Sequence, residues 1–187
     1  MNDDGDSDNS EGENPQYYAN FIRELLQAEA DSKSNIKVIY PMLAGRQHLL
    51  TDRCAEILQQ VAQNLIAEHP EAIESILGDI GNLSSDISNF SLGKRANNLE
   101  IAITDYQILL SNWEPGSEKW ASTQNNLANA YSDRIRGEKA QNIELAHLIL
   151  VHYPSTPAMP FPKIGQVRKI IWQRFTVTEA GEIKLRI

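Results

Sequence analysis

The sequence predicts an all-α protein built from stacked helical repeats. Residues 93–102, GKRANNLEIA, return as residues 137–146, GEKAQNIELA, 44 positions further along the chain. An internal period of 20–50 residues is typical of stacked supersecondary units. Apolar residues also recur at helical spacing through much of the chain. Aromatic residues make up only 7% and hydrophobic residues 41% of the 187 positions, which favours an elongated array over a thick core.

The first part of the chain is predicted to be an acidic leader followed by a helical N-terminal cap. Residues 1–14 are acidic with almost no apolar side chains, so disorder is expected, with an acidic tail for a basic partner as the alternative. Residues 15–69 form the helical region, beginning with Asn14 as a cap and Pro15 in the first turn. Within it, residues 31–45 are expected to be a connector or short helical turn. Their strand-like run 36–40 has no partner strand nearby.

Residues 70–146 are predicted to hold the repeats. Helical spacing runs through 73–92 and again through 99–113, and Pro115-Gly116 then breaks the chain. Ser117 is positioned to cap a further helix. The residues at the apolar helix positions form the expected repeat core: Leu99, Ala102, Tyr106, Trp120, Leu127 and Tyr131.

Residues 98–146 resemble the long-period tetratricopeptide (TPR) repeat of bacterial proteins. Leu127, Ala128 and Tyr131 match the Leu, small and Tyr positions of the first TPR helix, and Ala102 and Tyr106 match the second. The loop 136–140 lengthens the usual unit of about 34 residues. The resemblance implies a right-handed superhelix. Residues 17–68 are also similar to the helical region before TPR arrays in proteins with a caspase-like CHAT domain.

The resemblance also implies a peptide-binding groove lined by the first helix of each repeat. Asn129 stands at the Asn position of the family's carboxylate clamp, but Asn125 replaces its lysine, so a C-terminal carboxylate is not the expected ligand. Side-chain amides can bond a peptide backbone as donor and acceptor. The alternative is that they satisfy contacts between repeats. The groove candidates are Ser122, Asn125, Asn126, Asn129 and Asp133.

No catalytic residue, cofactor or metal is expected. The histidines show no ligand spacing, and neither an H-E-x-x-H nor a C-x-x-C motif is present. Cys54 falls on an apolar helix face, which favours core packing over nucleophilic chemistry. The aspartates are expected at surface-type helix positions, without a paired acid and base: Asp52, Asp79, Asp86, Asp105 and Asp133.

Composition excludes several partner classes and indicates a cytoplasmic protein. A net charge of −8 argues against a nucleic-acid surface, because phosphate binding needs clustered Lys and Arg. The acidic start is unlike a signal peptide, and no apolar run reaches the ~20 residues of a membrane span. A single cysteine excludes an internal disulfide and fits a reducing compartment.

Residues 147–187 are predicted to form an irregular tail with at most a marginal hairpin, the candidate strands being 167–174 and 183–187. Four prolines between 154 and 162 end any helix. In a shifted reading frame the codons of 159–160 and 172–173 must both give alanine, and the frame can spell much of residues 120–142 again. The tail is therefore interpreted as an out-of-frame third repeat.

The predicted function is that of a TPR-type adaptor that binds a protein or peptide partner without catalysis. One alternative is the severed N-terminal regulatory region of a CHAT-type caspase-like protease. The other is a degraded reading frame with no selected role.

Overall fold

The computed structural model describes residues 14–135, 137–152, 175–177 and 183–185. The chain divides into two units, Met1–Pro154 and Ser155–Ile187. The described part of the first unit is all helical, as predicted, with two short 3₁₀ turns, η2 (Gln47–Leu49) and η3 (Pro70–Ala72). Its α-helices are α1 (Pro15–Ser32), α2 (Ile36–Gly45), α3 (Asp52–Glu68), α4 (Ile73–Asn89), α5 (Arg95–Asn112), α6 (Glu118–Asp133) and α7 (Lys139–His152).

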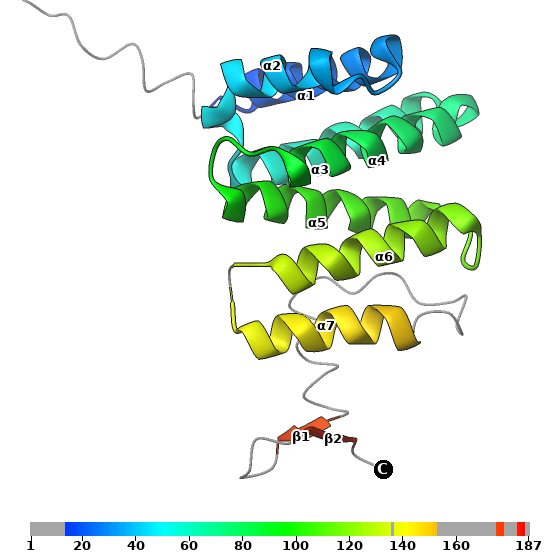
Figure 1. Cartoon of the computed structure of the whole chain (residues 1–187). Helices are drawn as coiled ribbons and strands as arrows, with labels where there is room; N and C mark the ends of the chain where they lie inside the picture. Colours follow the sequence, from blue (N-terminus) through cyan, green and yellow to red (C-terminus); the bar gives the residue numbers. More distant parts are fainter. Residues whose placement is uncertain (1–13, 136, 153–174, 178–182, 186–187) are drawn as a thin grey trace, which may run out of the picture. The chain divides into compact units, whose positions relative to one another are not determined.

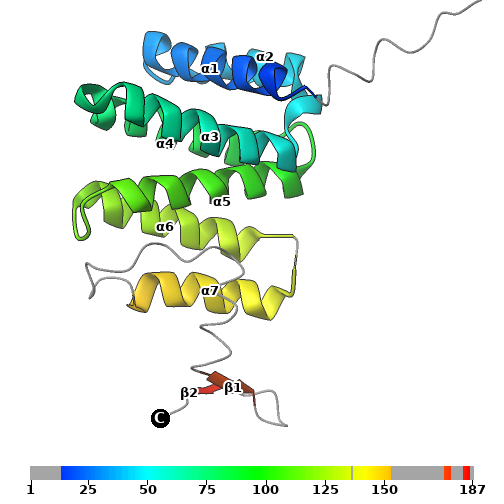
Figure 2. The same cartoon turned by 180° about the vertical axis from the view of Figure 1, so that it is seen from behind.

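The helices of the first unit are stacked in chain order (Figures 1 and 2). α1 and α2 form one layer, α3 and α4 the next, and α5, α6 and α7 follow in turn. Each of α4, α5 and α6 packs on the helix that follows it, and α5 also packs on α3. Contacts between sequence neighbours are expected of a repeat array, in which each unit touches only those next to it.

The 44-residue sequence period is also a structural period. α5 begins at Arg95 and α7 at Lys139, 44 residues later, and the ends of α4 and α6 are separated by the same number. The loops before α5 and α7 each contain a glycine with a positive φ, 78° at Gly93 and 79° at Gly137. L side chains rarely adopt this conformation, so glycine is needed at both turns.

The same two loops are closed by the same hydrogen bond. Asn98 Nδ2 donates to the Phe90 carbonyl at 3.2 Å, and Asn142 Nδ2 donates to the Arg134 carbonyl at 3.3 Å. Donors and acceptors are both 44 residues apart. Both asparagines are buried, so each amide satisfies a backbone carbonyl at the end of the preceding helix.

Local signals in the sequence explain where several helices start and which face they bury. The Asn14 side chain accepts from Gln16 N at 2.9 Å, and the Ser117 side chain accepts from Trp120 N at 3.2 Å, so both predicted caps are present. All of the expected repeat-core residues are buried, with exposures of 0 to 4%: Leu99, Ala102, Tyr106, Trp120, Leu127 and Tyr131.

The expectation for residues 31–45 is wrong, because α2 is a full helix. The Asn35 side chain caps it by accepting from Lys37 N, and Pro41 is accommodated inside. Ile39 and Leu43, one turn apart, are both fully buried. Tertiary burial of this i, i+4 pair therefore overrides the strand-like composition of the segment.

α7 extends beyond Ala146 and ends at His152, within the region 147–187 that was interpreted as the tail. Ile149 is 6% exposed, and its burial explains why the helix persists past Ala146. In the second unit, β1 (Phe175–Val177) and β2 (Ile183–Leu185) pair antiparallel with Thr176 opposite Lys184. The predicted strand 167–174 and the leader 1–13 lie outside the described residues.

Candidate functional site

The groove candidates share one side of α6. The side chains of Ser122, Asn125, Asn129 and Asp133 are exposed, and that of Asn126 is half-buried. The opposite side of this helix carries the buried core residues of the repeat. One candidate is already engaged, since the Asp133 carboxylate lies 3.6 Å from Arg95 Nη2 at the start of α5. The other exposed candidates, Ser122, Asn125 and Asn129, form a polar strip, here called the α6 amide face.

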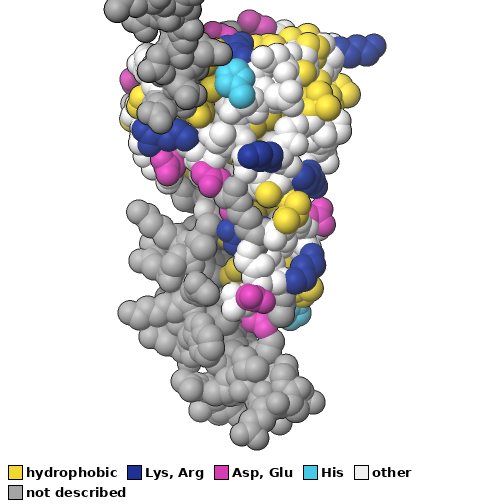
Figure 3. All heavy atoms as spheres, turned by 90° about the vertical axis from the view of Figure 1, so that its left-hand side faces the viewer, with side chains coloured by type: hydrophobic (Ala, Val, Ile, Leu, Met, Phe, Trp, Pro, Cys, Tyr) yellow, Lys and Arg dark blue, Asp and Glu magenta, His cyan; other side chains and the backbone are white. Residues whose placement is uncertain are grey.

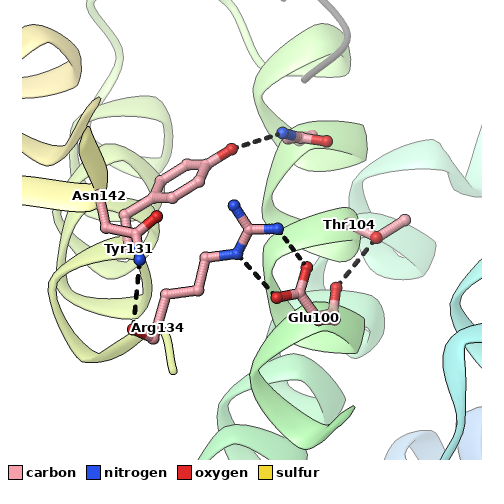
Figure 4. Close-up of polar contacts among 6 residues, drawn as sticks. Glu100, Thr104, Tyr131, Arg134 and Asn142 are labelled. Atoms are coloured by element: carbon pink, nitrogen blue, oxygen red, sulfur yellow. Dashed lines mark hydrogen bonds and ion pairs between the residues drawn. The ribbon is translucent and has the colours of Figure 1, made fainter. Parts of the chain in front are cut away.

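Near the α6 amide face, an ion pair between Arg134 and Glu100 joins the end of α6 to α5 (Figure 4). Arg134 donates two hydrogen bonds to Glu100, Nε to Oε1 at 2.7 Å and Nη2 to Oε2 at 2.8 Å. Both side chains are nearly buried, at 14% and 13% exposure. The hydrogen bonds to Glu100 raise the pKa of Arg134. A bidentate, partly desolvated pair fixes geometry as well as charge.

Tyr131 continues the same polar contact between the two helices. Its hydroxyl accepts a hydrogen bond from Gln107 Nε2 at 3.1 Å, and the Arg134 guanidinium lies 5.8 Å from its ring centroid. Burial raises the pKa of the Tyr131 phenol. The hydroxyl therefore remains protonated and serves packing between α5 and α6.

A shallow pocket of about 230 Å³ lies between α3 and α5. This volume is below the usual 300–1,000 Å³ of small-molecule sites. Among its lining residues, Glu56 is paired with Arg53 and Glu100 with Arg134. None of the groove candidates lines it. The lining residues are Asp52, Ala55, Glu56, Gln59, Glu100 and Thr104.

The expectation that Asp105 lies on the surface is wrong. Its side chain is fully buried, and Ser84 Oγ on α4 donates to Asp105 Oδ2 at 2.9 Å. Burial raises the pKa of this carboxyl well above its usual value. Because α3, α4 and α6 all pack on α5, this position has no solvent side, and the charge pattern alone could not show it. Asp52 and Asp133 are exposed as predicted, whereas Asp79 and Asp86 are half-buried.

A second buried acid, Glu29 on α1, was missed by the sequence reasoning. It is fully buried where α1 packs on α4. Burial is the main cause that raises its pKa to about 7, and the neighbouring Asp86 contributes. Glu29 follows Leu25 and Leu26 by four and three residues, so its place on the buried stripe of α1 was the available signal.

The features that would indicate metal or thiol chemistry are not found in the described residues. Among them, no group of three or more His, Cys, Asp or Glu side chains is arranged to hold a metal ion. Cys54 is 1% exposed, and burial raises the pKa of its thiol. The thiol is therefore protonated, as expected for a core residue. Among the described helices, none has the length and apolarity to cross a membrane.

Comparison with known proteins adds no relative from which a role could be transferred. No protein-family model, no curated protein and no solved structure matches this chain.

Proposed function

We propose that this chain is a TPR-type protein-interaction module that binds an extended segment of a partner protein on its α6 amide face. The observation that carries the proposal is the division of α6 into two sides. Its apolar side is fully used in packing, whereas Ser122, Asn125 and Asn129 are exposed. Exposed amides in a row offer both donors and acceptors to a peptide backbone.

A right-handed array would place α4 and α6, the first helices of successive repeats, along one concave face. α4 contacts α6, and Lys119 Nζ lies 3.2 Å from Glu74 at the start of α4. The position 44 residues before Ser122 is Gly78, and a Cβ added there would meet nothing within 4 Å. The surface of α4 therefore carries no side chain at Gly78, which leaves room for the backbone of a bound segment.

The expected ligand is an internal, polar or basic peptide segment. Asn125 lacks the positive charge that would select a terminal carboxylate, and the chain carries a net charge of −8. On the face formed by the helix ends, Lys and Arg side chains are intermixed with Asp and Glu side chains among the described residues (Figure 3). This interspersed pattern supports a protein partner over nucleic acid, which needs clustered cations.

The proposed module acts in the cytoplasm as an adaptor, without catalysis, cofactor or metal, and binds no membrane. The buried, protonated Cys54 supports a role without thiol chemistry. The all-helical first unit supports a scaffold whose surface, and not an enclosed cavity, makes the contact.

The test is selection of peptides from a random display library on the full chain, followed by calorimetric titration of the best binder. Asn125→Ala combined with Asn129→Ala should weaken that binder at least tenfold, since two backbone hydrogen-bond partners are lost. Far-UV circular dichroism should be unchanged, because both residues are exposed.

Gln63→Ala combined with Asn64→Ala is the matched control, because it removes two exposed amides from α3. This pair should leave affinity unchanged. Failure to select any peptide, full affinity in the α6 variant, or equal loss in the α3 variant would each contradict the proposal.

A further inference from the structure

One side of α7 is exposed, whereas the equivalent side of α5 is buried under neighbouring helices. The two helices repeat each other at 44 residues, yet Leu99 on α5 is 1% exposed and the equivalent Ile143 on α7 is 51% exposed. In the same way, Ile103 is fully buried whereas the equivalent His147 is exposed. These positions lie one turn apart and therefore share one side of the helix.

The structure shows what covers this side of α5. Gln107, one turn beyond Ile103, donates to Tyr131 of α6, and Glu100 pairs with Arg134 at the end of α6. α6 thus lies along the stripe that passes through positions 103 and 107. The matching stripe of α7 contains Ile143 and His147, with Glu144 at the place of Glu100.

The α6 side of α7 is already occupied by different residues. Asn142, Ala146 and Ile149 are buried, and the Ile149 carbonyl accepts from Gln124 Nε2 of α6 at 3.2 Å. Ile143, Glu144 and His147 lie outside this contact and are here called the α7 docking face. Glu144 is half-exposed, so its carboxylate is accessible to a partner.

We propose that the α7 docking face binds an amphipathic helix of a partner protein that has the pattern of α6. That helix would cover Ile143 with apolar side chains and place an arginine near its C-terminal end against Glu144, as Arg134 meets Glu100. The occupant follows from an interface already present in the chain, with the same acid at the same repeat position. The proposal uses no residue of the α6 amide face, so it stands or fails separately from peptide binding there.

The probe is a fluorescein-labelled peptide with the sequence of residues 117–135, titrated with the full chain and followed by fluorescence anisotropy. Saturable binding is expected, and Ile143→Glu should weaken it at least tenfold, because a charge would enter the apolar contact. Ile36→Glu is the matched control, since Ile36 on α2 is 50% exposed. It should bind the peptide as the unchanged chain does.

A charge exchange distinguishes docking on α7 from displacement of the chain's own α6. Glu144→Arg should weaken binding of the original peptide, and a peptide carrying Arg134→Glu should restore it by pairing with the new arginine. Absence of saturable binding would overturn the proposal. So would full binding by Ile143→Glu, or failure of the reversed peptide to recover affinity for Glu144→Arg.

Discussion

At the scale of single residues, Glu29 is expected to make stability depend on pH. Its pKa is raised from 4.5 to about 7, first by burial and then by the charge of Asp86. Between these values the folded chain holds a proton that the unfolded chain has released. The contribution of Glu29 to stability is therefore greatest below pH 4.5, falls as pH rises to about 7, and changes no further above that.

Glu29→Gln should remove this loss, because glutamine stays neutral at every pH. At pH 8 the variant should be about 1–3 kcal/mol more stable than the natural chain, because a rise in pKa from 4.5 to about 7 corresponds to roughly 3 kcal/mol at most. At pH 5, where the folded chain still holds the proton, the difference should fall to less than about 1 kcal/mol. Urea unfolding at both values measures it, with the exposed Glu68→Gln as control. Equal stabilisation at pH 5 and pH 8 would show that Glu29 does not titrate as described.

At the same scale, Asp105 shows why charge is a poor guide to exposure. Aspartate in an amphipathic pattern normally indicates the solvent side, but α5 is enclosed by three helices and Asp105 bonds Ser84 within the core. The enclosing helices begin as far back as Asp52. The sequence around Asp105 contains no signal of burial by such distant segments, so helical spacing alone could not predict that Asp105 is buried.

At the scale of elements, the two repeated loops make a prediction about hydrogen bonding. Asn98 Nδ2 lies 3.2 Å from the carbonyls of both Phe90 and Leu92. Asn98→Ala leaves these acceptors without that donor and should lower the free energy of unfolding by about 1–3 kcal/mol. Asn64→Ala, an exposed asparagine of α3, should stay within about 0.5 kcal/mol. Denaturant unfolding compares them, and equal midpoints would contradict a structural role for Asn98.

Elements within the repeat were predictable because local signals agree there. The cap at Ser117 and the spacing of Trp120, Leu127 and Tyr131 all favour α6, and the structure contains this helix with those residues buried. In α2, strand-like composition and Pro41 opposed the helix, and only burial of Ile39 and Leu43 decided it. Agreement between local and tertiary preferences is what makes an element predictable.

The candidate site also combines features that could be predicted from the sequence with features that could not. Exposure of the α6 amide face follows from helical spacing, since residues opposite a buried stripe face solvent. The pocket of α3 and α5 could not be predicted, because Asp52 and Glu100 become neighbours only after these helices pack. The ion pair between Glu100 and Arg134 could not be predicted for the same reason, because it joins residues 34 positions apart in the sequence.

At the scale of the whole molecule, the first unit is expected to fold without residues 155–187. Every buried core residue among those described lies at or before Ile149, so the first unit contains its own hydrophobic core. A chain ending at Pro154 should therefore keep its thermal unfolding midpoint within error. Residues 155–187 contain six Lys and Arg against two Glu, so deletion changes the net charge from −8 to −12. Both chains should be compared at about 0.15 M salt, where long-range charge effects are screened.

Hydrogen exchange on the full chain and on the shortened one tests the same prediction by segment. α4, α5 and α6 should exchange slowly and equally in both, because their amides lie in helices packed on two or more neighbours. Equal protection with an unchanged midpoint would show that stability resides within residues 14–154. A lower midpoint, or faster exchange in α5 of the shortened chain, would show instead that residues 155–187 contribute to the stability of the repeats.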